Sequence, residues 1–205
     1  MRLFLSQEGV IKGAPRQRDN RTFTLAILTA LLLFMLPVTC HAEANGLKRN
    51  LIKTAFVFNI AKFVNWPDEV HRIRPQNLHI CFYRKDFLQR AFTSIEGKRV
   101  RTRQVGRRII EHAAESEQCD VVLIAASHLP RFEDESAQQT KHPALVIADL
   151  TSMPTSPRVF RGVTMNLVRQ GKSIGFEVNL NDVKQRGLSM SSELLKLARI
   201  IDTER

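Results

Sequence analysis

The sequence predicts an α/β protein: a single domain with a mixed, mostly parallel sheet, flanking helices and a C-terminal hairpin plus helix. Three observations predict this class. Apolar residues recur at helical spacing over residues 48–65, continuous aliphatic runs follow at 119–126 and 144–148, and two alternating segments at 163–169 and 173–179 flank a short turn. Helices alternating with buried strands are typical of this architecture. We find no internal repeat and no linker, so we expect one domain over residues 43–205.

The first strong element is a helix over residues 48–65, with Ile52, Ala55, Phe56, Ile60 and Phe63 as its apolar stripe. Helical spacing of apolar residues predicts the face that packs on the core. The pair Trp66-Pro67 ends this helix, because proline disfavours helical geometry in the residue before it.

Strands and short helices follow. Residues 77–83 alternate as a strand, with Leu78, Ile80 and Phe82 on one face, and residues 86–94 form a short helix. The segment 98–105 is rich in basic residues, which is typical of an edge strand. The aliphatic runs at 119–126 and 144–148 predict central strands that are buried on both faces. Residues 163–179 read as a hairpin, and Ser191 to Asp202 as a final amphipathic helix.

The first 42 residues read as a secretory signal. An arginine-containing stretch ends at Arg21, an apolar stretch spans residues 25–36, and Cys40-His41-Ala42 follows Pro37. This order of positive, apolar and small-residue regions is that of a signal peptide. The apolar stretch is shorter than the roughly 20 residues needed to cross a bilayer. We expect cleavage after Ala42 and export to the periplasm; an uncleaved membrane anchor and a lipid attached at Cys40 are the alternatives.

The chain carries a net charge of +11. Residues 1–42 contain five basic and two acidic side chains, which leaves 26 basic and 18 acidic ones, a net charge of +8, for the rest. Such a surplus suits a nucleic acid or membrane partner. The basic segment 98–108 lacks the interleaved aromatic residues or recognition helix of nucleic-acid modules. We therefore expect a solvated basic face and no nucleic-acid partner.

Cysteine usage agrees with export. Once Cys40 is removed, Cys81 and Cys119 remain. An even count in an oxidising compartment favours a disulfide, and two buried thiols on separate strands are the alternative. Neither cysteine lies in a Cys-x-x-Cys unit, and two cysteines without a local histidine pair are too few for a structural zinc site. We expect neither redox catalysis nor a bound metal.

No catalytic constellation stands out. The chain has no Gly-x-Gly-x-x-Gly, no phosphate-binding Gly-rich loop and no Gly-x-Ser-x-Gly elbow. We expect solvated histidines at positions 112, 128 and 142, and helix-capping serines at positions 189, 191 and 192. Asp149 follows a buried strand, where α/β proteins often place functional groups, and capping of the next turn explains it equally well. The sequence thus predicts no enzyme and no cofactor.

Several stretches, taken in order, resemble one family. They are Lys53-Thr-Ala-Phe-Val-Phe-Asn59, Ala61-Lys-Phe-Val-Asn-Trp-Pro67, Gly97-Lys-Arg-Val100, Cys119-Asp-Val-Val-Leu-Ile124, Gly162-Val-Thr-Met-Asn-Leu-Val168, Gly175-Phe-Glu-Val-Asn179 and Gly187-Leu-Ser-Met-Ser-Ser-Glu-Leu-Leu-Lys-Leu-Ala198. Together they resemble the YfiR family of periplasmic proteins over essentially the whole mature chain. The sequence departs from the family pattern at Arg161, where a glycine is usual, and at Gly175, where a basic residue is usual.

The resemblance implies a non-catalytic regulator. Members of the YfiR family bind the periplasmic sensor domain of an inner-membrane diguanylate cyclase and hold it inactive. An outer-membrane lipoprotein can capture the regulator, which raises cyclic di-GMP and favours biofilm. Members also tend to form homodimers. Cys81 and Cys119 match family cysteine positions, so the resemblance supports a disulfide between them and a stability that depends on redox state.

We expect the partner surface to include the hairpin and the residues after it, namely Met165, Glu177, Asn179 and Val183. Strand alternation places Phe176 and Val178 in the core and Glu177 and Asn179 on the opposite face. Two alternatives belong to other functional classes. One is a periplasmic small-ligand-binding module with a pocket near Asp149 or the carboxyl ends of the strands, and the other is a hydrolase whose constellation the sequence does not assemble.

Overall fold

The computed structural model describes residues 40–85, 88–137, 139, 141–154 and 158–201. The chain divides into two units, Met1–Ala42 and Glu43–Arg205. The secretory signal predicted over residues 1–42 lies outside the described residues, apart from Cys40 to Ala42. Among the described residues, no helix is long and apolar enough to cross a membrane. The second unit holds the fold.

The second unit is built on an eight-stranded sheet with the order β10-β8-β7-β6-β5-β2-β4-β3. Its strands are β2 (Asn77–Tyr83), β3 (Arg99–Val100), β4 (Arg103–Ile110), β5 (Val121–Ala125), β6 (Leu145–Asp149), β7 (Met165–Gln170), β8 (Ser173–Asn179) and β10 (Arg199–Ile201). The five strands β4, β2, β5, β6 and β7 are parallel, whereas β3 is antiparallel to β4, β8 is antiparallel to β7, and β10 is parallel to β8. A separate ladder pairs β1 (Val64–Asn65) with β9 (Ser189–Met190). The predicted class, a mixed and mostly parallel sheet in a single α/β domain, is confirmed.

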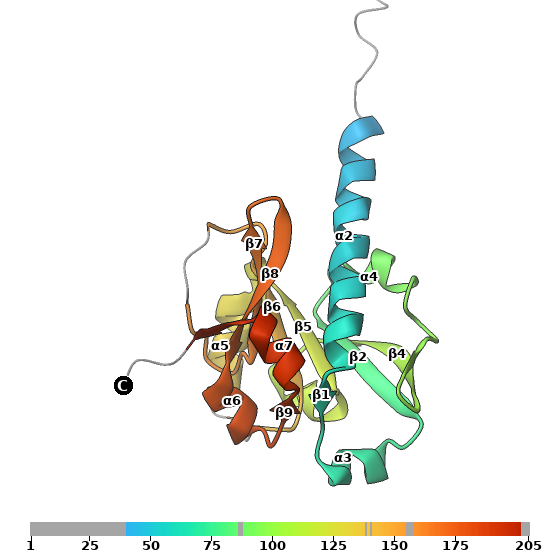
Figure 1. Ribbon diagram of the computed structural model, residues 1–205, viewed down its shortest axis with the longest axis vertical. Coiled ribbons are helices and arrows are strands. Elements are labelled where there is room, and N and C mark those ends of the chain that lie inside the picture. Colours follow the sequence, from blue (N-terminus) through green and yellow to red (C-terminus); the bar gives the residue numbers. More distant parts are fainter. Residues whose placement is uncertain (1–39, 86–87, 138, 140, 155–157, 202–205) are drawn as a thin grey trace, which may run out of the picture. The chain divides into compact units, whose positions relative to one another are not determined.

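Helices cover both faces of the sheet (Figure 1). They are α2 (Cys40–Ala61), α3 (Asp68–Ile73), α4 (Leu88–Phe92), α5 (Leu129–Ser136), α6 (Leu180–Gln185) and α7 (Ser192–Leu197), with two 3₁₀ helices, η1 (Ala113–Gln118) and η2 (Ala126–His128). Strand alternation divides the apolar residues between two cores. One core packs under α2, α4 and α7, and the other packs under η1 and α5.

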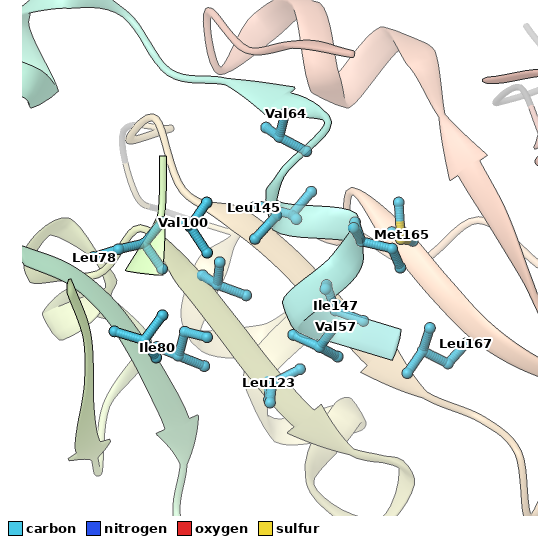
Figure 2. Packing of buried hydrophobic residues seen from close by; sticks show 14 of the residues in the cluster. Val57, Val64, Leu78, Ile80, Val100, Leu123, Leu145, Ile147, Met165 and Leu167 are labelled. Carbon is cyan, nitrogen blue, oxygen red and sulfur yellow. The ribbon is translucent and has the colours of Figure 1, made fainter. Parts of the chain in front are cut away.

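The larger core lies between α2 and the sheet (Figure 2). Val57 of α2 faces inward-pointing residues of neighbouring strands, among them Leu123, Ile147 and Leu167. These side chains are at most 4% exposed. One helix thus packs across several strands, and burying this apolar area is the main stabilising contribution of the fold.

The helix prediction was correct in kind and wrong in detail. The helix ends at Ala61, and Val64–Asn65 form the short strand β1. Two residues of the expected stripe, Ile52 and Phe63, are 49% and 41% exposed. Ile60 of the expected stripe is buried as predicted, but the rest of the buried face runs through Thr54, Val57 and Ala61. The helix is apolar on two sides, and periodicity does not select between them.

Two other segments differ from their predictions. The segment 98–105 is indeed at an edge of the sheet, but it contains β3 and the start of β4, joined by a tight turn in which Arg101 has φ of 54°. The predicted helix from Ser191 to Asp202 ends at Leu197, and Arg199–Ile201 form β10. The outer side of β8 presents backbone N–H and C=O groups at this point. Residues 199–201 pair with them as a strand instead of forming a last helical turn.

Candidate functional site

The hairpin β7–β8 carries the residues that the sequence singles out for partner contact. Gly171, at φ of 60°, forms its turn, a left-handed conformation that glycine adopts without steric cost. Met165 pairs with Val178, and Asn166 pairs with Glu177. Met165 and Val178 point into the larger core, so Asn166 and Glu177 point to the other face of the sheet.

The structure brings the four predicted contact residues into one region but buries all of them. Met165 is 1% exposed, Glu177 0%, Asn179 6% and Val183 3%. The expectation that Glu177 and Asn179 present an accessible face is therefore wrong. The alternation is as expected, but chain segments cover both faces of β8. Contact of this region with a partner protein stays a prediction.

Glu177 is a fully buried carboxylate held by two side chains. It accepts a hydrogen bond from Asn166 Nδ2 at 2.9 Å and forms an ion pair with Arg199 of β10. Asn166 Nδ2 also donates to the carbonyl oxygen of Arg158 at 2.9 Å. The Arg199 side chain is 49% exposed, so this cation approaches the buried charge from solvent.

Asn179 and Val183 have structural roles beside a second buried carboxylate. The Asn179 side chain accepts a hydrogen bond from the Asp182 backbone N–H at 3.1 Å and so caps α6, while Val183 packs in the larger core. Asp182 itself lies 2.7 Å from Arg186 Nε and accepts from Thr164 Oγ1 at 3.1 Å. Burial acts to raise the pKa of Asp182, but the charge of Arg186 and the hydrogen bond from Lys141 lower it below the ordinary value.

Asp149 is the last residue of β6, and an ion pair and two turn-capping hydrogen bonds hold its carboxylate. Its Oδ2 lies 2.7 Å from Lys53 Nζ of α2, and its Oδ1 accepts from the Thr151 backbone N–H and hydroxyl at 3.1 and 2.7 Å. Capping of the following turn, one of the two expected roles, is thus observed. The ion pair ties α2 to the carboxyl edge of the sheet.

A groove of about 760 Å³ opens beside this ion pair, between α2 and the tip of the hairpin. Ile52, Phe56 and Ile174 give it an apolar side, and Arg49, Lys53, Arg169 and Lys172 give it a basic one. No Asp or Glu is among its lining residues. The arrangement suits a ligand that combines an anionic group with an apolar body.

The other candidate chemistry stays dispersed. Of the three serines expected to cap the last helix, Ser191 does so, because its Oγ accepts from the Leu194 backbone N–H at 3.2 Å. The expectation is wrong for Ser189, which lies in β9, and for Ser192, which is the first residue of α7. His112 lies 3.8 Å from Glu135, and His142 lies 3.9 Å from Glu117. Within the described residues, no group of three or more His, Cys, Asp or Glu side chains is arranged to hold a metal ion.

The sequence missed one cluster, which centres on Asp120. This carboxylate is fully buried; its Oδ1 lies 2.7 Å from Arg103 Nη1, and its Oδ2 accepts from the His79 backbone N–H at 2.7 Å. Trp66 Nε1 donates to the Asp120 carbonyl oxygen at 3.0 Å, and the Arg103 guanidinium lies over the Trp66 ring. Arg103 is the buried member of an otherwise exposed basic segment. Nothing in the sequence pattern distinguishes it from the neighbouring arginines, so this role could not be predicted.

The structure joins Cys81 and Cys119 in a disulfide, with 5.9 Å between their Cα atoms. Cys81 lies in the middle of β2, and Cys119 lies two residues before β5. Both are buried. The bond therefore links two neighbouring parallel strands next to the Asp120 cluster.

Comparisons with known proteins give one informative match. No curated protein matches the sequence. One of the solved structures that the chain matches, an ABC domain in complex with L-Trp from Streptococcus pneumonia, shares 9% identity; the match covers 69% of this chain and 62% of that one, with a TM-score of 0.39. That likeness carries no functional argument. A YfiR/HmsC-like family model matches residues 50–199, from the middle of α2 to the first residue of β10. The chain belongs to the YfiR/HmsC-like family, whose members are generally non-catalytic and whose membership implies a regulator of a diguanylate cyclase.

Proposed function

We propose that this protein is a periplasmic regulator that binds the sensor domain of an inner-membrane diguanylate cyclase and represses it, which lowers cyclic di-GMP. The observation that carries the proposal is the family match over residues 50–199. The disulfide and the family membership together favour a location outside the cytoplasm. Cleavage of residues 1–42 by a signal peptidase is part of the proposal.

The use of charged residues inside the domain fits a binding protein. Each of the carboxylates Asp120, Asp149, Asp182 and Glu177 is paired with a lysine or arginine within the same chain. Paired carboxylates of this kind hold elements of the fold together. They support a role in which the domain presents a surface rather than a reaction centre.

Cyclic di-GMP in living cells tests the proposal. We expect deletion of the gene to raise cyclic di-GMP, and complementation with the full chain to restore the original level. Complementation with a chain that starts at Glu43 lacks the signal, stays in the cytoplasm and leaves cyclic di-GMP high. Cyclic di-GMP is measured by mass spectrometry of cell extracts. An unchanged level after deletion contradicts the repressor role, and rescue by the leaderless chain contradicts the location.

The partner itself is tested with purified proteins. The periplasmic domain of a diguanylate cyclase from the same organism is expected to bind the mature chain in calorimetry. A substitution at Glu177 is unsuited to this test, because that side chain is buried and its loss disturbs folding. Association with a second copy and capture by an outer-membrane lipoprotein remain further expectations, which light scattering and co-purification check.

A small-ligand-binding module is the second candidate, and the groove beside Lys53 and Asp149 favours it. If the groove is the functional site, small anionic compounds with an apolar body raise the melting temperature of the wild-type chain. Phe56→Ala and Lys172→Ala remove an apolar and a basic wall of the groove and reduce that shift. No shift from any such compound, together with binding to the cyclase domain, excludes this candidate.

A further inference from the structure

The outer side of β8 is only partly covered. β10 pairs with Glu177, Val178 and Asn179, and its register goes no further toward the hairpin turn. β8 begins at Ser173. Within the described part of the chain, residues 173–176 therefore have β7 on one side and no strand on the other.

Two hydrogen bonds fix which backbone groups face this open side. The Asn179 N–H donates to the Thr164 carbonyl oxygen, and the Leu167 carbonyl oxygen accepts from the Leu150 N–H, so Leu167 is turned toward β6 and away from β8. Leu167 is opposite Phe176. Since the N–H and C=O groups of alternate residues point to opposite sides of a strand, those of Ile174 and Phe176 point outward. Ile174 lies beyond the register of β10.

The side chains around this open edge are apolar and basic. A small hollow of about 80 Å³ lies there, lined by Val168, Arg169, Gln170, Gly175, Phe176, Leu197 and Arg199. Leu197 is 76% exposed, the highest value among the large apolar side chains of the described residues. The lining contains two arginines and no carboxylate.

The opposite edge of the same sheet is protected. There β3 is only two residues long, one of them is the exposed Arg99, and the exposed Lys98 and Arg101 flank it. Short, charged edges are the usual defence against pairing with another chain. The β8 edge also has basic neighbours, Arg169, Lys172 and Arg199, but it adds a branched apolar residue, Ile174, and an exposed leucine. These two side chains offer an incoming strand apolar contacts beside the open backbone groups.

We propose that residues 173–176 of β8 form a docking edge onto which an extended, acidic segment of the cyclase sensor domain adds as a further strand, ending against Leu197. The inference rests on the proposed function and names the surface that performs it. Main-chain hydrogen bonds to the outward N–H and C=O of Ile174 and to the N–H of Phe176 give the affinity of such strand addition, and side-chain pockets give its specificity. The C=O of Phe176 belongs to the ladder with β10, where Arg199 is opposite Glu177. An apolar side chain of the segment fills the hollow beside Phe176 and Leu197, and its carboxylates lie near Arg169 and near the exposed part of Arg199, which stays paired with Glu177.

A proline at position 174 tests the backbone part of this proposal. Ile174→Pro removes the outward N–H, and this amide takes no part in the β7–β8 ladder, so the hairpin keeps its pairing. We expect the affinity for the purified cyclase sensor domain, measured by calorimetry, to fall at least about tenfold. Ile174→Val keeps the N–H and is the matched control, with an affinity close to that of the wild type. Circular dichroism verifies that each variant is folded.

Leu197→Ser tests the side-chain part and decides the matter if the proline variant does not fold. Ile73→Ser is its control, because Ile73 is 65% exposed on α3, away from β8. We expect a several-fold loss of affinity for Leu197→Ser only, and weaker wild-type binding at 0.5 M than at 0.1 M NaCl. Wild-type affinity in folded variants at both positions overturns the docking edge while the proposed function stands. Absence of wild-type binding overturns both, and loss of self-association in Ile174→Pro with full cyclase binding assigns the edge to a second copy instead.

Discussion

The half of the sheet formed by β2, β4 and β5 is held differently from the half formed by β7, β8 and β10. Each half contains a fully buried carboxylate, Asp120 in the first and Glu177 in the second. The two arginines that pair with Asp120, Arg103 and Arg74, are 3% and 15% exposed, whereas the arginine that pairs with Glu177 is 49% exposed. The first half also has the disulfide, and the second ends in a three-residue strand.

This comparison shows how one sheet can combine a rigid region with one that opens at low cost. The free energy needed to separate an ion pair depends on whether water replaces the lost partner. Water reaches Arg199 readily, and β10 is attached to the sheet through one neighbour only. The half that carries the proposed docking edge is thus the half with fewer constraints.

The largest expected effect concerns Arg103 and Arg199. Arg103→Ala removes the nearer of the two arginines beside the buried Asp120 carboxylate and leaves only Arg74, whose Nε is 3.5 Å from Oδ2. We expect a loss of about 3–5 kcal/mol in the free energy of unfolding. Arg199→Ala is the matched variant, and its expected loss is about 1–2 kcal/mol, because solvent reaches the vacated position. Urea unfolding followed by fluorescence of Trp66 measures both. Equal losses would show that the two halves are equally constrained.

The disulfide gives the next effect. Its two cysteines are 38 residues apart, and for such a loop the chain-entropy model gives about 3–4 kcal/mol. We expect Cys81→Ala/Cys119→Ala to lose that amount in urea unfolding, and reduced wild type to match the double variant. Hydrogen exchange is expected to rise more in β2 and β5 than in β8. A uniform rise over the whole sheet would remove the distinction between the halves.

The smallest expected effect is that of acidic pH, which lowers the stability of the second half of the sheet by protonating Asp182. Its pKa in the folded state is below the ordinary value, so its favourable contribution is complete above the unfolded value of about 3.9 and is lost as the pH falls through the lower folded value. We expect wild type to be more stable than Asp182→Asn at pH 6, and the difference to shrink below about pH 4. Melting temperatures across this range check it. Asp134→Asn, an exposed change on α5, is the control, and an equal pH dependence of both variants would rule out this role for Asp182.

Much of the fold could be predicted from the sequence, because strands buried on both faces leave a clear pattern. The aliphatic runs of β5 and β6 and the alternation of β2 appear where expected. The face of α2 could not be predicted, since Ile52 and Val57 are equally apolar and only the sheet decides which is buried. The strand β10 was read as helix, because its pairing depends on β8, which lies in the chain before α6 and α7.

The candidate site was harder to predict, because its residues become significant only through tertiary contacts. Alternation gave the correct face for Glu177 and the wrong exposure, since Arg199 and Arg158 are distant in sequence. The open edge at Ile174 is invisible to periodicity, which identifies faces of a strand and not its sides. Asp120 follows a cysteine in the sequence, and no other feature marks it as part of a cluster. Its partners Arg103 and Trp66 lie in two other segments, and nothing in the sequence links them to Asp120.

The chain order of the disulfide-linked half has a consequence for assembly. β2, β4 and β5 occupy residues 77–125 without interruption by any other strand of the sheet except β3. A chain that emerges residue by residue can therefore complete and cross-link this part before β6 is available. During that interval β5, a central strand in the finished molecule, is a temporary edge. The time between closing of the disulfide and arrival of residue 145 is then the period in which the unfinished protein most needs a chaperone.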